Sequence, residues 1–428
     1  MAEIACFAAK NDDLAENTRT PPFLFCEIRK LFSVSLGIIR LSTISWLRVL
    51  LSLMVVDAHY GFFKRFYDDI IVSNFNSILP NIQPCGPGNI AVGGFFIISG
   101  FLIAEILEKK YREKTLQGLI HFVLARSLRI YPLYLIVLTA FVIAHLLSSA
   151  NHSHSPSIFL NYTLFYYGIA DFFRTRPAWE PLFIFPAWTL AYDFIFYPIG
   201  AILYQSRKIL FASSGLVLIL YLYIAITKTQ PATWIFFDYD NTWWNMNFYS
   251  TPIPNLLVFL LGMLTRLYAA KLDFPTGRYV ILGSLGVVLY VAYLPYGLTC
   301  FSEQLLSIAA FLLLVNALAK NGYGKYDSFL SNWTFALYLI HALVFVFIDR
   351  QFVKHGFHHH VGITSLFVSI IIAALLAIFV EGNLIEKKRK AWLASWQPQN
   401  STMVNYNILA SLVFLLIASS VIFFFIKL

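Results

Sequence analysis

The feature that most constrains the fold is a series of long apolar runs that fills most of the 428 residues. A transmembrane helix needs about 20 apolar residues, because each residue adds about 1.5 Å and the hydrocarbon core is about 30 Å thick. Only 12% of the residues are charged, against about a quarter in soluble domains. We therefore predict an all-α, polytopic integral membrane protein with about eleven transmembrane helices, at about 44–63, 89–107, 131–149, 186–204, 209–227, 251–268, 279–297, 303–319, 332–350, 362–380 and 407–427.

The distribution of positive charge predicts the topology. With the N-terminus in the cytoplasm, most of the 31 Lys and Arg residues fall on the cytoplasmic side, as the positive-inside rule requires. The C-terminus is then outside. The net charge of +9 reflects this topology and indicates no nucleic-acid partner. We expect three parts: a cytoplasmic tail and juxtamembrane segment (1–43), a membrane domain (44–390), and a linker with an extra C-terminal helix (391–428). Residues 158–173 are predicted to be interfacial or re-entrant.

Arg48 and His59 are ionisable residues inside the first apolar run, eleven positions apart. Eleven helical steps make three turns plus about 20°, so both side chains share one helix face, about 16 Å apart along the axis. Ionisable groups are costly in lipid and usually face the protein interior at a functional site. A snorkelling arginine and a hydrogen-bonded core histidine are the alternatives. We predict a site that reaches inward from the cytosol.

Small residues mark one face of the second apolar run. They favour close packing against another helix, and they are Gly93, Gly94, Ser99 and Gly100.

Arg126 and Arg129 follow an amphipathic cytoplasmic stretch, Leu116–Leu128, that continues into the third apolar run. At i and i+3 the two side chains point the same way and suit bidentate phosphate binding. Ordinary juxtamembrane charge is the alternative.

Three more ionisable residues lie in or beside apolar runs. Asp193 lies about seven residues inside the membrane, where a carboxylate must pair with a cation or stay protonated. His341 lies near the middle of its run, and Glu381 lies at the cytoplasmic mouth of the penultimate run.

Taken in order, six patterns resemble the acyltransferase-3 family of integral-membrane O-acyltransferases over about residues 46–390. They are Arg-x10-His, FFxxSGF, RxxRIYP, WxLxx(acid)xxxY, LYLIH and a late glutamate. The resemblance implies three groups of site residues: catalytic (Arg48, His59, Asp193), acyl-CoA-binding (Arg126, Arg129, Phe95, Phe96, Ser99, Gly100), and further candidates (Trp188, Tyr197, His341, Glu381).

The chain departs from the family's pattern in three places. Asp193 stands where glutamate is usual, Thr334-Phe335-Ala336 replaces Ser-Tyr-Ser, and Gly382 replaces a proline. These departures leave the acceptor side of the site open.

The resemblance implies transfer of an acyl group, with acetyl expected, from cytosolic acyl-CoA to a hydroxyl of a saccharide or lipid-linked glycan. His59 would act as general base, because imidazole titrates near neutral pH, or would carry the acyl group itself. A transporter or flippase is the competing hypothesis, in which the buried charges line a substrate path. We expect a bacterial inner-membrane protein in contact with lipid, with no metal. Outside aromatics would suit sugar stacking, although membrane-interface residues are the commoner explanation: Trp234, Phe236, Tyr239, Trp243 and Trp244. Histidines of another outside loop, His355 and His358–His360, would bind metal only adventitiously.

Overall fold

The computed structural model describes residues 44–61, 86–112, 115–148, 161–164, 184–227, 233–234, 237–238, 252–272, 277–293, 300–320, 324–354, 361–395, 403 and 405–427. These residues are almost entirely helical, and a helix coincides with each of the apolar runs predicted from the sequence. The helices are α3 (Ile44–Tyr60), α6 (Gly86–Lys110), α7 (Leu116–Ser148), α10 (Trp188–Tyr204), α11 (Arg207–Thr227), α13 (Pro252–Leu272), α14 (Arg278–Tyr293), α15 (Cys300–Ala319), α16 (Asp327–Lys354), α17 (Val361–Leu375), α18 (Lys387–Ser395) and α19 (Tyr406–Lys427).

Four further elements complete the described structure. A 3-10 turn, η2 (Phe185–Ala187), leads into α10, and a π-helix, η5 (Leu376–Glu386), joins α17 to α18. The strands β1 (Thr233–Trp234) and β2 (Phe237–Asp238) pair antiparallel.

Five helical segments of the described chain are long and apolar enough to cross a membrane. They are Gly86–Lys110, Leu116–Ile143, Ser302–Ala319, Asp327–Phe352 and Val361–Ser395. Shorter apolar helices lie at Pro254–Ala269, Arg278–Tyr293 and Tyr406–Ser419. The chain is therefore a helical membrane protein, whereas the total of eleven spans and the orientation of the termini stay predictions.

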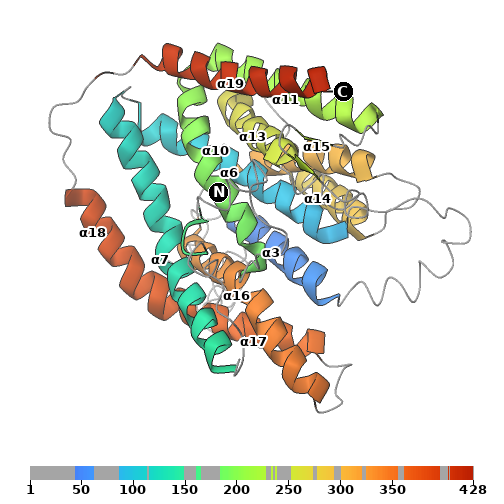
Figure 1. The fold of residues 1–428 in the computed structure, drawn as a ribbon, viewed down its shortest axis with the longest axis vertical. Coiled ribbons are helices and arrows are strands. Elements are labelled where there is room, and N and C mark those ends of the chain that lie inside the picture. Colours follow the sequence, from blue (N-terminus) through green and yellow to red (C-terminus); the bar gives the residue numbers. More distant parts are fainter. Residues whose placement is uncertain are drawn as a thin grey trace, which may run out of the picture.

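Helix α6 is the central element of the bundle. In Figure 1 it lies across the middle of the molecule, between α13 and α3, and it also packs against α15 and α10. Its apolar residues lie on all sides, and 67% of its apolar 18-residue stretch is buried, as expected for a helix enclosed by others.

Two glycines bring the backbones of α6 and α13 into contact. A Cβ atom at Gly100 would overlap the carbonyl oxygen of Phe259, and one at Gly262 would overlap the carbonyl oxygen of Ile97. The predicted close packing is thus confirmed for Gly100. Gly94 faces a different neighbour, the Phe311 ring of α15.

Helix α7 is a single helix of 33 residues with Pro132 inside it. Its first half is the amphipathic stretch around Arg126 and Arg129, so the predicted continuity into the apolar run is confirmed. Proline removes one backbone hydrogen bond without ending the helix here.

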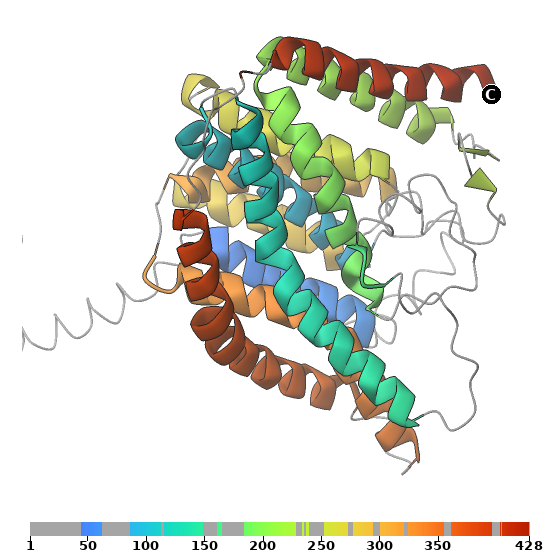
Figure 2. The same ribbon diagram turned by 60° about the vertical axis from the view of Figure 1, so that its left-hand side comes forward.

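The C-terminal helix α19 lies alongside α11 and also contacts α10 (Figure 2). The Tyr406 hydroxyl near its start donates to the Thr115 carbonyl, 3.1 Å away, and Thr115 also pairs with Met403 in a β-bridge. The beginnings of α7 and α19 therefore lie at the same face of the bundle.

Candidate active site

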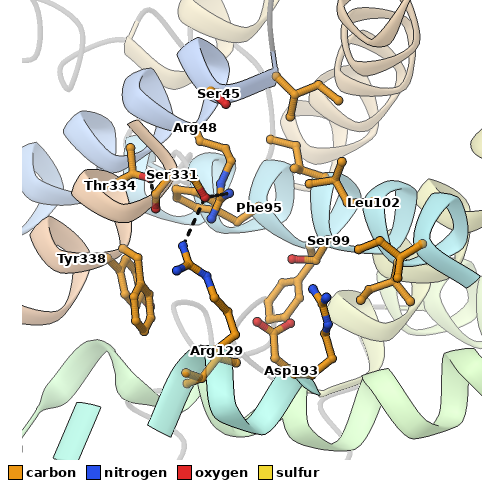
Figure 3. Close-up of a pocket in the computed structure, with 18 of the residues that line it drawn as sticks. Ser45, Arg48, Phe95, Ser99, Leu102, Arg129, Asp193, Ser331, Thr334 and Tyr338 are labelled. Carbon is orange, nitrogen blue, oxygen red and sulfur yellow. Dashed lines mark hydrogen bonds between the residues drawn. The ribbon is translucent and has the colours of Figure 1, made fainter. Parts of the chain in front are cut away.

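A cavity of about 630 Å³ opens among α3, α6, α7, α10 and α16. Eight of the residues selected from the sequence line it: Arg48, Phe95, Phe96, Ser99, Arg126, Arg129, Asp193 and Tyr197. Four of these helices, α3, α6, α7 and α10, thus direct the candidate residues toward one space (Figure 3).

Arg48 and Arg129 converge on one hydroxyl. The Arg48 guanidinium donates to Ser331 Oγ at 2.8 Å, and that of Arg129 reaches the same atom at 3.3 Å. Figure 3 shows the two side chains approaching Ser331 from α3 and α7. Ser331 of α16 therefore holds the two cations on opposite sides of a common point.

Glu381 is the buried counter-ion of Arg129. Its side chain is 0% exposed and forms an ion pair with Arg129, while a guanidinium nitrogen of Arg389 lies 3.6 Å from the same oxygen. The wider turn of η5 carries Glu381 inward, whereas α18 supplies Arg389. The Phe335 ring, 5.8 Å from the guanidinium carbon, covers Arg129 from another side.

Arg126 makes fewer hydrogen bonds and ion pairs than Arg129. Its guanidinium lies 5.9 Å from the centre of the Phe122 ring, and its Nε has no hydrogen-bond partner in the described part of the chain. Both arginines of the RxxR pattern line a protein cavity, which favours a binding role over ordinary juxtamembrane charge. Arg126 is the cation best placed to bind an added anion.

Asp193 brings a carboxylate into the same cavity. Tyr197 and Ser99 line the cavity beside it. The Asp193 oxygen Oδ1 has no hydrogen-bond partner among the residues described. Figure 3 shows Asp193 directed toward the side of the cavity where Ser99 lies.

His59 and His341 lie together but do not line the cavity. Their ring centres are 5.1 Å apart, and Tyr338, which does line the cavity, has its ring centre 6.0 Å from that of His341. Arg48 thus lines the cavity, whereas His59 is exposed and does not line it, so a shared role for the two residues stays a prediction. Arg48 and His59 both belong to α3 but lie at different depths along it.

The environment of His341 indicates its tautomer. Its Nδ1 lies 3.2 Å from the Leu337 carbonyl oxygen. A carbonyl can only accept, so Nδ1 carries the proton and Nε2 carries the lone pair. That Nε2 is buried, with no hydrogen-bond partner in the described structure.

Two other candidates from the sequence lie away from the cavity. Gly100 packs against the backbone of α13 and does not line the cavity. Trp188 packs edge-on against Tyr192, with ring centres 5.4 Å apart, while its neighbour Thr189 lines the cavity. Trp188 therefore does not line the cavity although its neighbour does, because successive helix positions point in different directions.

Sequence reasoning missed the roles of Ser331, Thr189 and Tyr338. Thr189 and Tyr338 lie inside the quoted patterns WxL and LYLIH and could have been considered. Ser331 lies three residues before the altered Thr334-Phe335-Ala336 segment, where only the structure shows its two arginine partners.

The comparison with protein families decides the identity. The acyltransferase-3 family model, described as an acyltransferase domain, matches residues 41–382.

The chain belongs to the acyltransferase-3 family.

No curated protein and no solved structure gives a match to this acyltransferase. The matched region contains α3 through most of η5, and α18 and α19 lie beyond it. Within the described residues, no group of three or more His, Cys, Asp or Glu side chains could hold a metal ion. His355 and His358–His360 lie outside those residues, as do the outside aromatics apart from Trp234, which lies in β1.

Proposed function

We propose that this membrane acyltransferase moves an acetyl group from cytosolic acetyl-CoA, or a related acyl-CoA, to a hydroxyl of a cell-envelope or secreted saccharide. The observation that carries the proposal is the cavity lined by Arg48, Arg126 and Arg129. Guanidinium groups bind phosphate through paired hydrogen bonds, and CoA carries several phosphate oxygens. A bacterial inner membrane would bring a cytosolic donor and an external glycan together.

The cavity suits an elongated donor with a charged head. Its volume of about 630 Å³ lies within the usual range of about 300–1,000 Å³ for small-molecule sites. Phosphates would lie against the arginines, and the pantetheine arm would run along the apolar side chains Phe95, Leu102 and Ile106 of α6.

In the proposed reaction, the acceptor hydroxyl oxygen attacks the thioester carbonyl carbon. The new C–O bond forms, the C–S bond breaks, and CoA leaves as a thiolate. His59 takes the hydroxyl proton as general base and returns it to the thiolate. The lone pair on His341 Nε2 and the carboxylate of Asp193 are the candidates for orienting or relaying that proton. The acetyl group would pass the Tyr338 ring to reach His59.

A covalent version has the same participants. The acyl group would first pass to a nitrogen of His59 with loss of CoA, and the acceptor would then remove it. This version gives ping-pong kinetics, whereas direct transfer requires both substrates to be bound together.

The test is acyl transfer from radiolabelled acetyl-CoA in membranes that contain wild type, His59→Ala, Arg126→Ala or Arg266→Ala. Arg266 is a matched control because it pairs with Glu108 at 2.6 Å and does not line the cavity. We expect label in lipid-linked or extracellular glycan with wild type and Arg266→Ala only.

Thioester-dependent product separates an acyltransferase from a transporter. Label that persists in His59→Ala membranes at equal protein levels would contradict the role of His59. Labelled donor that is never consumed would favour the transporter hypothesis.

A further inference from the structure

Among the residues of α16 that line the arginine-lined cavity, Tyr338 lies furthest along the helix from Ser331. It lines the cavity, whereas His341, one helical turn further along α16, does not. The ring centres of Tyr338 and His341 are 6.0 Å apart, and those of His341 and His59 are 5.1 Å apart. The three side chains thus form a sequence that leads from the cavity to the proposed base.

The Tyr338 ring is fixed in this position by its hydroxyl. It donates to the Pro186 carbonyl at 2.6 Å, and the Thr189 hydroxyl lies 2.5 Å away. Both partners belong to the turn where η2 enters α10. Phe95 contacts the ring edge-on, with centres 6.2 Å apart. Buried hydrogen bonds of this kind define one side-chain orientation, because leaving the groups unpaired is costly.

We infer that Tyr338 determines which acyl chain lengths the enzyme transfers. The inference rests on the proposed function, since it assumes an acyl-CoA whose phosphates lie at the arginines. The acyl end of such a donor would meet the Tyr338 ring at the far end of the cavity. An acetyl group adds one methyl beyond the carbonyl, whereas each further methylene needs space that the ring occupies. Short acyl groups therefore pass and longer groups are excluded.

The test measures donor preference rather than activity alone. Purified wild type and Tyr338→Ala are supplied with acetyl-CoA, butyryl-CoA and hexanoyl-CoA, and kcat/KM is measured for each. One methylene in an apolar pocket changes this ratio by roughly 10- to 200-fold. We expect Tyr338→Ala to raise the butyryl-to-acetyl ratio at least tenfold. The matched control Phe335→Ala enlarges the cavity beside Arg129 and should leave the ratio unchanged.

A second substitution protects the test against misfolding. Tyr338→Leu keeps part of the buried volume, and size-exclusion chromatography reports whether each variant is folded. If the alanine variant aggregates, the leucine variant decides by the same tenfold criterion. Thr189→Val keeps the ring but removes one hydrogen-bond partner, and it should relax the preference in the same direction by a smaller factor.

The outcomes separate this inference from the proposed function. A wild type that transfers acetyl while Tyr338→Ala or Tyr338→Leu keeps the same donor ranking would overturn the role of Tyr338. A wild type that prefers hexanoyl-CoA would overturn it as well. A wild type that transfers no acyl group from any CoA donor would instead overturn the proposed function.

Discussion

The ion pair between Arg129 and Glu381 should stabilise the fold as well as shape the cavity. Glu381 is fully buried and also faces Arg389 across 3.6 Å. Glu381→Gln keeps the size of the side chain and removes its charge. The two guanidinium groups then lose the carboxylate that they share, and we expect a large loss of stability.

The expected magnitude follows from the burial of the partners. Breaking a buried ion pair by removing one member costs about 3–5 kcal/mol, because an uncompensated charge remains. Arg129 keeps 21% exposure and its hydrogen bond to Ser331. We therefore expect Glu381→Gln to lower the free energy of unfolding by about 3 kcal/mol, the lower end of that range.

The measurement is an SDS titration of the purified protein in mild detergent, followed by tryptophan fluorescence. Glu108→Gln is the matched control, because Glu108 pairs at 2.6 Å with Arg266 and its side chain is 41% exposed. Surface pairs contribute about 0–1 kcal/mol, so this control should change little. Equal losses in the two variants would refute the reasoning. Additive effects of Arg129→Gln and Glu381→Gln in a double-mutant cycle would also refute it.

Three further predictions concern packing and donor binding. Gly100→Ala should sharply reduce the yield of folded protein, because its Cβ would overlap a backbone carbonyl, whereas Gly93→Ala, with nothing within 4 Å, should be tolerated; size-exclusion profiles compare them. Arg126→Gln should raise the KM for acyl-CoA roughly tenfold or more, because a hydrogen bond to a charged group contributes about 1.5–3 kcal/mol, and an unchanged KM would exclude phosphate binding there. Deleting residues 396–428 removes α19 and the bond from Tyr406 to Thr115. The deletion should lower the thermal midpoint but keep the activity of the surviving folded protein.

The helices were predictable because their signal is local. A run of apolar residues long enough to cross a membrane has few alternative structures, and every predicted run coincides with a described helix. The clustering of Arg48, Arg126 and Arg129 was also predictable in outline, since cations near lipid turn toward the protein interior.

Contacts between distant segments could not be predicted from those patterns. Helical periodicity placed Arg48 and His59 on one face of α3, but only the structure shows that Arg48 lines the cavity while His59 packs against His341, nearly 300 residues later in the chain. Gly100 fits both a donor-binding motif and a packing face in the sequence, and only the position of α13 decides between them. Nothing in the sequence distinguishes Ser331 from the other serines, and only the structure shows its two arginine partners.

The direct backbone contact between α6 and α13 restricts how the enzyme can admit a bulky donor. At Gly100 and Gly262 the two backbones touch, and no side chain lies between them at these points. A Cβ at either position would overlap a carbonyl oxygen, so the spacing of α6 and α13 is fixed there. The cavity itself is lined by α3, α6, α7, α10 and α16, and hydrogen bonds to Ser331, rather than touching backbones, join α3 and α7 to α16. We expect the cavity to widen for a bulky donor at these hydrogen bonds.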